Sequence, residues 1–412
     1  MDASETVKGR SAVVEALNLA RTSSGDGAHI LRPLDHYDID PVTGFVPSAD
    51  PLERLPPRYD PWEGLVPSIA PLIRSGRMRA ELAQLPCLGL DDLWSDPELE
   101  RALLILTTFA NAWVWGGSEP DLKIPGTIAM PLVDLAAKLD RPPISHYGSM
   151  VLHNWRRVDR SRPVSADNAQ MMIGFLGGVD EEWFYLASMG VELAGAGLLA
   201  SIREAAIASH EEDDEDLTRK AQRIVDGMEP VIAALERMRE WCDPYIFYHR
   251  VRIFVAGWPA PGVVYDGRWT DPRRLTGGSA GQSALIQAID AVLGVVHDGT
   301  ATGKFFKEMR TYMPRRHRRF VEDVERVSRL RSRAETGSET LRRAYDAAIA
   351  QVDRFRLAHR RIAHDYITVP SGMAADAIGT GGTMLAKFLD DARQETSRLA
   401  FDGSQARDQA DA

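Results

Sequence analysis

Cysteine is scarce in this 412-residue sequence, which contains only Cys87 and Cys242. Two cysteines so far apart exclude a disulfide framework, and they lack the paired spacing of a zinc site. We therefore expect the protein to work in a reducing compartment, where both thiols stay free.

Long hydrophobic runs and an excess of positive charge are also lacking. No stretch approaches the roughly 18 consecutive apolar residues that span a membrane, and the first residues contain no apolar run typical of a signal peptide. The net charge of -10 disfavours a broad nucleic-acid-binding surface. These absences predict a soluble, cytoplasmic protein that binds neither a membrane nor nucleic acid.

Strand patterns are few, and helical patterns dominate the chain. The clearest strand patterns are 250–257 and 262–265. Helical spacing of apolar residues predicts helices at 95–115, 181–209, 216–240, 283–297 and 339–367, with another starting near Met384. The expected fold class is mainly α, with a large all-helical domain and a smaller α-rich N-terminal domain that contains little β structure.

The chain divides into four expected parts. Residues 1–30 are polar and read as a loosely ordered start, and 31–67 are proline-rich and read as an extended surface segment. We predict a small N-terminal domain over 31–175, a large helical domain over 176–400 and a C-terminal tail over 401–412.

His359 lies in the middle of an apolar stripe on the helix expected over 339–367. At about 100° per residue, one face of that helix carries Ala348, Val352, Phe355, His359, Ile362 and Tyr366. His364 falls on the opposite side. A buried imidazole needs a partner for its nitrogens. The stripe alone favours a backbone carbonyl as that partner, and a haem iron is the alternative.

Asp290 is a lone carboxylate within the apolar helix expected over 283–297. A buried carboxylate needs a cationic or donor partner. Arg356, one turn before His359, is a candidate for that partner. The pair would fix the helix beneath a cofactor, or it is an ordinary ion pair between two helices.

Two glycine-rich segments flank these helices. GGSAGQS (277–283) lacks the lysine of a phosphate-binding loop. It is either a helix start capped by Ser279 or Ser283, or a closely approachable floor for a flat ligand. GTGGT (379–383) follows no strand, which excludes a dinucleotide-binding fold. It is either a loop that closes over a substrate or a flexible linker.

Ten segments, taken in order from about Leu55 to Glu395, resemble the indoleamine 2,3-dioxygenase family. They are LPPRYDPWE (55–63), ANAWVWGG (110–117), RPPISHYGSMVLHNW (141–155), DEEWFYLASMGVE (180–192), DPYIFYHRVRIFVAGW (243–258), GVVYDG (262–267), GGSAGQS (277–283), EMRTYMPRRHRRF (308–320), RLAHRRIAHDYI (356–367) and GTGGT (379–383). Each segment alone is weak, but ten in register with plausible spacing are a strong signal.

The resemblance implies a haem b cofactor held by one proximal histidine, which matches His359. Arg356 and Asp290 match the arginine beside a haem propionate and the acid that pairs with it. Ser279 and Ala280 would lie along the haem edge, and the N-terminal domain would cover the distal side. A thiolate from Cys242 is the less favoured iron ligand, because free cysteine is usually a small buried hydrophobe.

The resemblance also implies a distal substrate pocket. Tyr147, Met150 and Val151 would line it beyond the iron, and Phe184 and Phe247 would contact an indole ring. The position of Met150 often holds cysteine in the family.

Three polar residues complete the implied pocket. Ser188 matches the distal serine that stands near the bound gas and the indole nitrogen, where a neutral hydroxyl orients rather than acts as a base. Arg252 matches the arginine that binds the substrate carboxylate. Thr380 matches a loop threonine that closes over the amino-acid end. Tyr185 departs from the family, because a second phenylalanine can stand there.

The implied reaction is the insertion of both atoms of O2 across the indole C2–C3 bond of L-tryptophan or a related indoleamine, giving N-formylkynurenine from tryptophan. It requires ferrous haem and an electron donor that keeps the iron reduced. Three alternatives remain open: monooxygenation or rearrangement of a tryptophan derivative, a haem-based gas sensor with little turnover, and a helical scaffold without haem.

Overall fold

A computed structural model describes residues 31–297, 300–372, 379 and 384–402. Its longer helices are α5 (Asp96–Trp115), α6 (Gly126–Leu139), α7 (Val179–Ala194), α8 (Ala196–Ala208), α9 (Asp214–Glu236), α13 (Ala284–Leu293), α14 (Ala301–Arg310), α15 (Arg315–Val327), α17 (Glu339–Ala363) and α19 (Leu385–Ser397). The shorter helices are α2 (Asp60–Glu63), α3 (Ile69–Arg74), α4 (Met78–Leu82), α10 (Met238–Trp241), α11 (Pro244–Ile246), α12 (Arg252–Val255), α16 (Leu330–Thr336) and α18 (Val369–Ser371). The mainly α prediction is confirmed.

The β structure within the described residues is small. Strand β1 (Lys123–Ile124) pairs in parallel with β4 (Val264–Tyr265), and β2 (Trp155–Arg157) pairs with β3 (Ala169–Met171) in antiparallel register. Three short stretches form π-helical turns: Gly148–Leu152, Phe247–Val251 and His364–Thr368. All three lie beside the pocket described below.

Most predicted helices form close to their expected bounds. Ser95 caps α5 by accepting a hydrogen bond from the Glu98 amide, and the Glu98 side chain completes a capping box. The helix expected over 181–209 is divided into α7 and α8 at Gly195, where an added Cβ would overlap Leu285. The helix expected over 283–297 ends early at Leu293, because Gly294 adopts a left-handed conformation with φ +70°.

The strand predicted over 250–257 is wrong. This segment forms the end of a π-helical turn and then α12. Its buried side chains are Val251, Phe254 and Val255, and with Phe247 just before the segment they recur at the spacing of one helix face rather than alternating. The β-branched composition suggested a strand, but the helical spacing of the buried residues decided the structure. The strand predicted over 262–265 forms only as β4.

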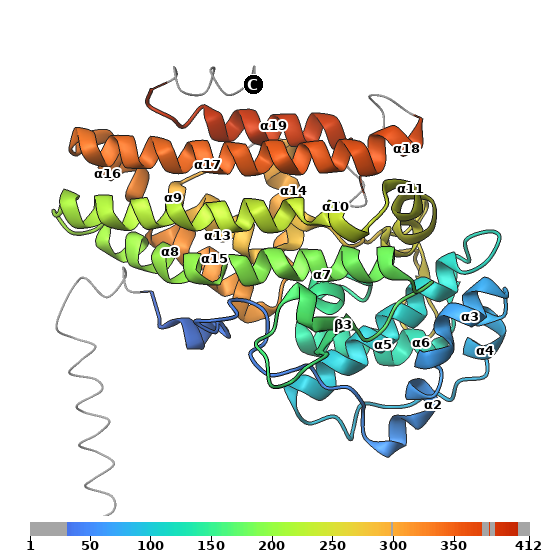
Figure 1. Cartoon of the computed structure of the whole chain (residues 1–412). Helices are drawn as coiled ribbons and strands as arrows, with labels where there is room; N and C mark the ends of the chain where they lie inside the picture. The colour runs from blue at the N-terminus through green and yellow to red at the C-terminus, as the bar shows by residue number, and fades with distance from the viewer. Residues whose placement is uncertain (1–30, 298–299, 373–378, 380–383, 403–412) are drawn as a thin grey trace, which may run out of the picture.

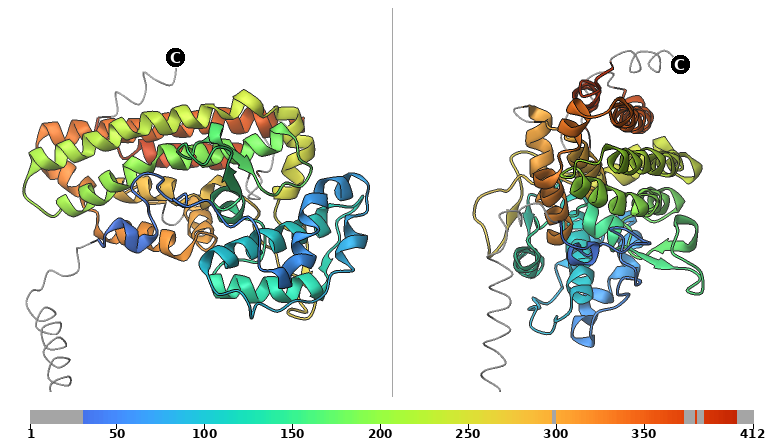
Figure 2. Two further views of the ribbon diagram at one scale, coloured as in Figure 1. Left: turned by 60° about the horizontal axis from the view of Figure 1, so that its bottom comes forward. Right: turned by 90° about the vertical axis from the view of Figure 1, so that its left-hand side faces the viewer.

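The long helices form stacked layers. Figure 1 shows α19, α17, α9 and α7 following one another through the molecule, and α9 packs against α17 on one side and against α7 and α8 on the other. Helices α13 and α15 pack against each other and support α8. Helices α2 to α6 form a lobe at one end of these layers (Figure 2).

Two groups of buried apolar side chains meet along α7. One group contains Met189 of α7 together with most of the buried lobe residues, and the other contains Val191 of α7 together with α8, α9, α13 and much of α17. Helix α7 therefore serves both cores. The division of the chain into domains at residue 175 stays a prediction.

By length and composition alone, the stretch Val179–Ala208 is apolar enough to cross a membrane. Within the fold, 67% of its most apolar window is buried against other helices. This burial is typical of a core helix.

Candidate active site

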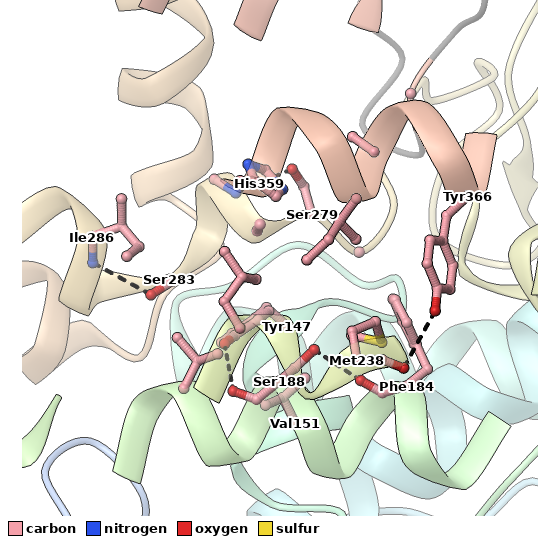
Figure 3. Close-up of a pocket in the computed structure, with 18 of the residues that line it drawn as sticks. Tyr147, Val151, Phe184, Ser188, Met238, Ser279, Ser283, Ile286, His359 and Tyr366 are labelled. Carbon is pink, nitrogen blue, oxygen red and sulfur yellow. Dashed lines mark hydrogen bonds between the residues drawn. The ribbon is translucent and has the colours of Figure 1, made fainter. Parts of the chain in front are cut away.

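A pocket lies between α7 and α17, close to the junction of the two cores. Figure 3 shows His359 on one side of it and Tyr147, Val151, Phe184 and Ser188 on the other. The described residues that line it are mostly apolar and come from α7, α9, α10, α12, α13, α14, α17, α19, the π-helical turns and the 278–283 segment. Of the residues predicted for the site, those that line this pocket are Tyr147, Met150, Val151, Phe184, Ser188, Phe247, Ser279, Ala280, Arg356 and His359.

His359 projects into the pocket from α17. Its ring is half-buried, and no residue in the described ranges forms a hydrogen bond with either ring nitrogen. Burial, reinforced by the nearby Arg356 charge, lowers the pKa of His359 to about 4. The imidazole is therefore neutral near pH 7, with a lone pair available to a metal. His364 is exposed on the other side of the helix beside Asp365, as the stripe predicted.

Arg356 and Asp290 form the buried pair that the sequence suggested. Nη2 of Arg356 lies 2.6 Å and 2.7 Å from the two carboxylate oxygens of Asp290. Burial alone would raise the pKa of Asp290, but Arg356 and His297 together outweigh burial and lower it. Asp290 lies behind Arg356 rather than at the pocket surface. Nε of Arg356 is buried with no partner in the part of the chain that the structure describes, so this donor is available to an anionic group in the pocket.

The Asp290 carboxylate also has a second neighbour that sequence reasoning missed. Nε2 of His297 lies 3.8 Å from Oδ2 of Asp290, and Nδ1 of His297 contacts the Glu395 carboxylate of α19. Burial alone would lower the pKa of His297, but Asp290 and Glu395 outweigh burial and raise it. Nothing in the sequence pattern links Glu395 to His297, which is distant along the chain.

The 277–283 segment contains the serine caps that the sequence suggested, and its role as a floor for a flat ligand stays a prediction. Oγ of Ser279 accepts a hydrogen bond from the Gly281 amide, and Oγ of Ser283 caps α13 by accepting from Ile286. An added Cβ at Gly277 would collide with the backbone near Val255. Gly277 therefore lets this segment lie close to the backbone of Val255–Gly257. Ser279 and Ala280 are at the pocket surface.

The wall opposite His359 is aromatic with one hydroxyl. The rings of Phe184 and Phe247 lie 4.6 Å apart between centroids. Oγ of Ser188 donates to the Phe184 carbonyl at 2.8 Å, and the hydroxyl of Tyr147 lies 3.4 Å from the Ser188 carbonyl. This wall can hold a flat ring and offer the hydroxyl lone pairs of Ser188 as hydrogen-bond acceptors.

Glu192 is a buried acid behind this wall that sequence reasoning did not single out. Its Oε1 accepts hydrogen bonds from Tyr147 Oη at 2.9 Å and from Ser283 Oγ at 2.6 Å. Burial outweighs these two hydrogen bonds and raises its pKa to about 7. Glu192 is the only charged residue between Glu182 and Arg203, so the argument used for Asp290, an acid isolated among apolar residues, would have found it.

Three candidates lie outside the described lining of the pocket. Arg252 is half-buried on α12, and its guanidinium carbon lies 5.2 Å from the centre of the Tyr248 ring. Thr380 lies outside the described residues, although its neighbour Gly379 lines the pocket. Cys242 is buried elsewhere, and burial raises the pKa of its thiol to about 12, which disfavours it as an iron ligand.

The donor set of the pocket is suited to a flat apolar group with an anionic edge. Among the described lining residues there is one imidazole, one guanidinium and several hydroxyls, with no carboxylate and no thiol. A neutral imidazole, a buried and unpartnered arginine N–H, and apolar walls match the needs of a haem: an axial ligand, a donor to a propionate and a dry cavity.

Comparison with known proteins gives one consistent result. A sequence model described as indoleamine 2,3-dioxygenase matches residues 33–399. Indoleamine 2,3-dioxygenase nanC of Aspergillus nanangensis is 34% identical over 396 residues, covering 88% of this chain and 96% of the relative. Indoleamine 2,3-dioxygenase 1 of Rattus norvegicus is 32% identical, covering 89% and 95%, and the indoleamine 2,3-dioxygenase of Saccharomyces cerevisiae is 31% identical, covering 90% and 95%. The chain therefore belongs to the indoleamine 2,3-dioxygenase family.

Proposed function

We propose that this protein is a haem-dependent dioxygenase that inserts both atoms of O2 across the indole C2–C3 bond. Its substrate is L-tryptophan or a related indoleamine, and the product from tryptophan is N-formylkynurenine. The observation that carries this proposal is His359, a neutral imidazole that faces an aromatic wall across an apolar pocket (Figure 3). Membership of the family supports the same reaction.

Haem b held by His359 would supply, in its ferrous state, the iron that activates dioxygen. Arg356 supports this assignment, because its buried Nε is free to donate to a propionate while Nη2 holds Asp290. Ser279 and Ala280 would lie at the edge of the cofactor. An electron donor that reduces the iron is part of the proposal.

The distal residues bind and orient the indole. Phe184 and Phe247 offer ring faces and edges, so the indole would be held in a fixed plane. The Ser188 hydroxyl already donates to the Phe184 carbonyl, which leaves its lone pairs to accept the indole N–H. Tyr147, Met150 and Val151 exclude water from this side.

Arg252 and Thr380 would bind the amino-acid end of the substrate. Arg252 begins α12 directly after the π-helical turn that contains Phe247, and its guanidinium carbon lies 5.2 Å from the centre of the Tyr248 ring. A carboxylate is a ligand that a guanidinium binds through two parallel hydrogen bonds. The role of Thr380 rests on its family position alone.

Met150 and Tyr185 adapt the pocket to a particular indole. Both line it, and the hydroxyl of Tyr185 is buried without a hydrogen-bond partner among the described residues. A polar substituent on the indole ring would satisfy that hydroxyl. The physiological substrate is therefore either tryptophan itself or a ring-substituted relative.

The proposal places the protein in a reducing, cytoplasmic compartment. Cys87 and Cys242 are both free thiols, one exposed and one buried. An exposed free thiol is typical of reducing conditions.

The test is the mass of the product formed from haem-loaded protein, a reductant, L-tryptophan and isotopically labelled dioxygen. A gain of two labelled oxygen atoms supports the proposal. A gain of one indicates monooxygenation. No product from a protein that holds haem, with tryptophan and with ring-substituted tryptophans, would contradict the dioxygenase assignment.

A further inference from the structure

A buried carboxyl group joins three separate segments behind the aromatic wall of the pocket. Glu192 belongs to α7 and is 1% exposed. One of its partners, Tyr147, precedes the π-helical turn Gly148–Leu152, and the other, Ser283, caps α13. We propose that Glu192 is a positioning residue that holds Tyr147 and Ser283 in place, and that its protonation state sets the affinity of the pocket for substrate.

Both hydrogen bonds reach the same oxygen. Oε1 of Glu192 accepts from Tyr147 Oη at 2.9 Å and from Ser283 Oγ at 2.6 Å. The backbone amide of Tyr147 also donates to the side-chain oxygen of Gln282 at 2.9 Å, which links the same two segments a second time. Both partners of Glu192 line the pocket, so a change at this carboxyl group reaches the pocket surface.

The second oxygen explains why the carboxyl group is sensitive to pH. Oε2 of Glu192 is buried and has no hydrogen-bond partner in the ranges that the structure describes. A buried, unpartnered oxygen disfavours the charged form, whereas two donors on Oε1 favour it. These opposed effects leave the pKa of Glu192 at about 7.

The groups that face Glu192 stay uncharged in the neutral pH range. The titratable neighbour is Tyr147, whose pKa burial and the Glu192 charge raise well above its usual value, so it stays neutral. Ser283 is an uncharged donor. No other charged group among the described residues contributes to the shift. Glu192 is therefore the group of this cluster that changes charge in the neutral range.

The direction of the effect follows from the two charge states. An ionised carboxylate accepts stronger hydrogen bonds than a neutral carboxyl group. Tyr147 and Ser283 are thus held more firmly above pH 7 than below it. When a substrate binds, less free energy is needed to order side chains that are already held firmly. We expect the dissociation constant of L-tryptophan to fall severalfold from about pH 6 to about pH 8.

Glu192→Gln separates the hydrogen bonds from the charge. The amide keeps an acceptor oxygen for Tyr147 and Ser283 but cannot ionise. We expect haem-loaded Glu192→Gln protein to bind L-tryptophan about as well as the wild type does at pH 6, with no gain at pH 8. Glu192→Leu removes both hydrogen bonds. Its dissociation constant should rise roughly tenfold at both pH values.

Glu181→Gln is the matched control. Glu181 lies on the same helix and is also 1% exposed, but its carboxylate accepts backbone N–H groups of Phe175, Leu176 and Gly177. This variant should keep the pH dependence of the wild type. If Glu192→Leu does not fold, Tyr147→Phe removes one of the two donors and should weaken the same dependence.

Infrared difference spectroscopy tests the titration without any turnover. The wild-type minus Glu192→Gln spectrum of the haem-loaded protein should contain the carbonyl band of a protonated carboxylic acid at about pH 6, and the band should disappear by about pH 8. This result is independent of the reaction that the enzyme catalyses, although the role in substrate binding rests on the proposed function. The absence of the band, or a Glu192→Gln variant that keeps the pH dependence of binding, would overturn the proposal.

Discussion

Two histidines on one helical stretch have different surroundings because they lie on different faces of it. His359 and His364 are five positions apart on the same helical stretch, yet one enters the pocket and the other is exposed beside Asp365. Burial keeps His359 neutral, whereas His364 remains in water. Their different surroundings give a matched pair of substitutions.

His359→Ala should abolish tight haem binding, because the pocket would lose its imidazole ligand while keeping its apolar walls. His364→Ala should bind haem as the wild type does. Titration of each purified protein with haem, followed by its absorption spectrum, measures the difference. Equal loss in both variants would remove His359 from its proposed role.

Arg252→Leu should raise the KM for tryptophan about tenfold or more and leave the haem content unchanged, because a hydrogen-bonded charge pair contributes about 1.5–3 kcal/mol. The change removes the proposed partner of the substrate carboxylate and leaves the His359 side untouched. Arg250→Leu is the control, since Arg250 is exposed two residues earlier. Steady-state kinetics of both variants provide the measurement, and an unaltered KM in Arg252→Leu would exclude this arginine from the site.

At the scale of elements, the sequence predicts those helices whose apolar residues recur at a regular local spacing. The stripe around His359 and the apolar spacing within 95–115 are periodic signals, so α17 and α5 lie close to where expected. The segment after Phe247 carries both β-branched composition and helical spacing, and composition misled the prediction. The joining of His297 to Glu395 depends on how α19 packs on α17, which no local pattern encodes.

The His297 network should make stability depend on pH. Asp290 and Glu395 raise the pKa of His297 above its unfolded value of about 6.5. Because the folded pKa is the higher one, the contribution is complete below about pH 6.5 and is lost as pH rises through the folded pKa. The wild type should therefore exceed His297→Gln in free energy of unfolding most clearly at mildly acidic pH.

Denaturant unfolding of both proteins across a pH series measures this difference. His210→Gln is a suitable control, because Nε2 of His210 contacts the Val327 carbonyl at 2.7 Å. A gap between wild type and His297→Gln that stays constant with pH would show that His297 acts through packing alone.

At the scale of the molecule, the pocket lies where two cores share α7. Met189 belongs to one group of buried side chains and Val191 to the other, and Ser188, next to Met189, lines the pocket together with Val191. A ligand that fills this pocket contacts residues on both sides of the junction. Binding is then linked to the stability of the whole fold.

Loading with haem should raise the thermal unfolding temperature. At a free haem concentration about 100 times its dissociation constant, binding to the folded state alone adds about 2.7 kcal/mol. For a domain of this size, the added free energy corresponds to a rise of several degrees. Calorimetry of the wild type and of His359→Ala, each with and without haem, measures the effect. A wild-type protein that binds haem but unfolds at the same temperature would show that the two cores are not linked through the pocket.

The two walls of the pocket also come from separate stretches of the chain. His359 and Arg356 belong to α17, whereas the opposite wall comes from the 147–152 turn, α7 and Phe247. We expect changes in this second set to alter which molecule is selected while leaving haem binding intact. Directed evolution can therefore target the second wall alone. A library restricted to that wall is expected to diversify substrate choice, while every member keeps the residues proposed to hold the prosthetic group.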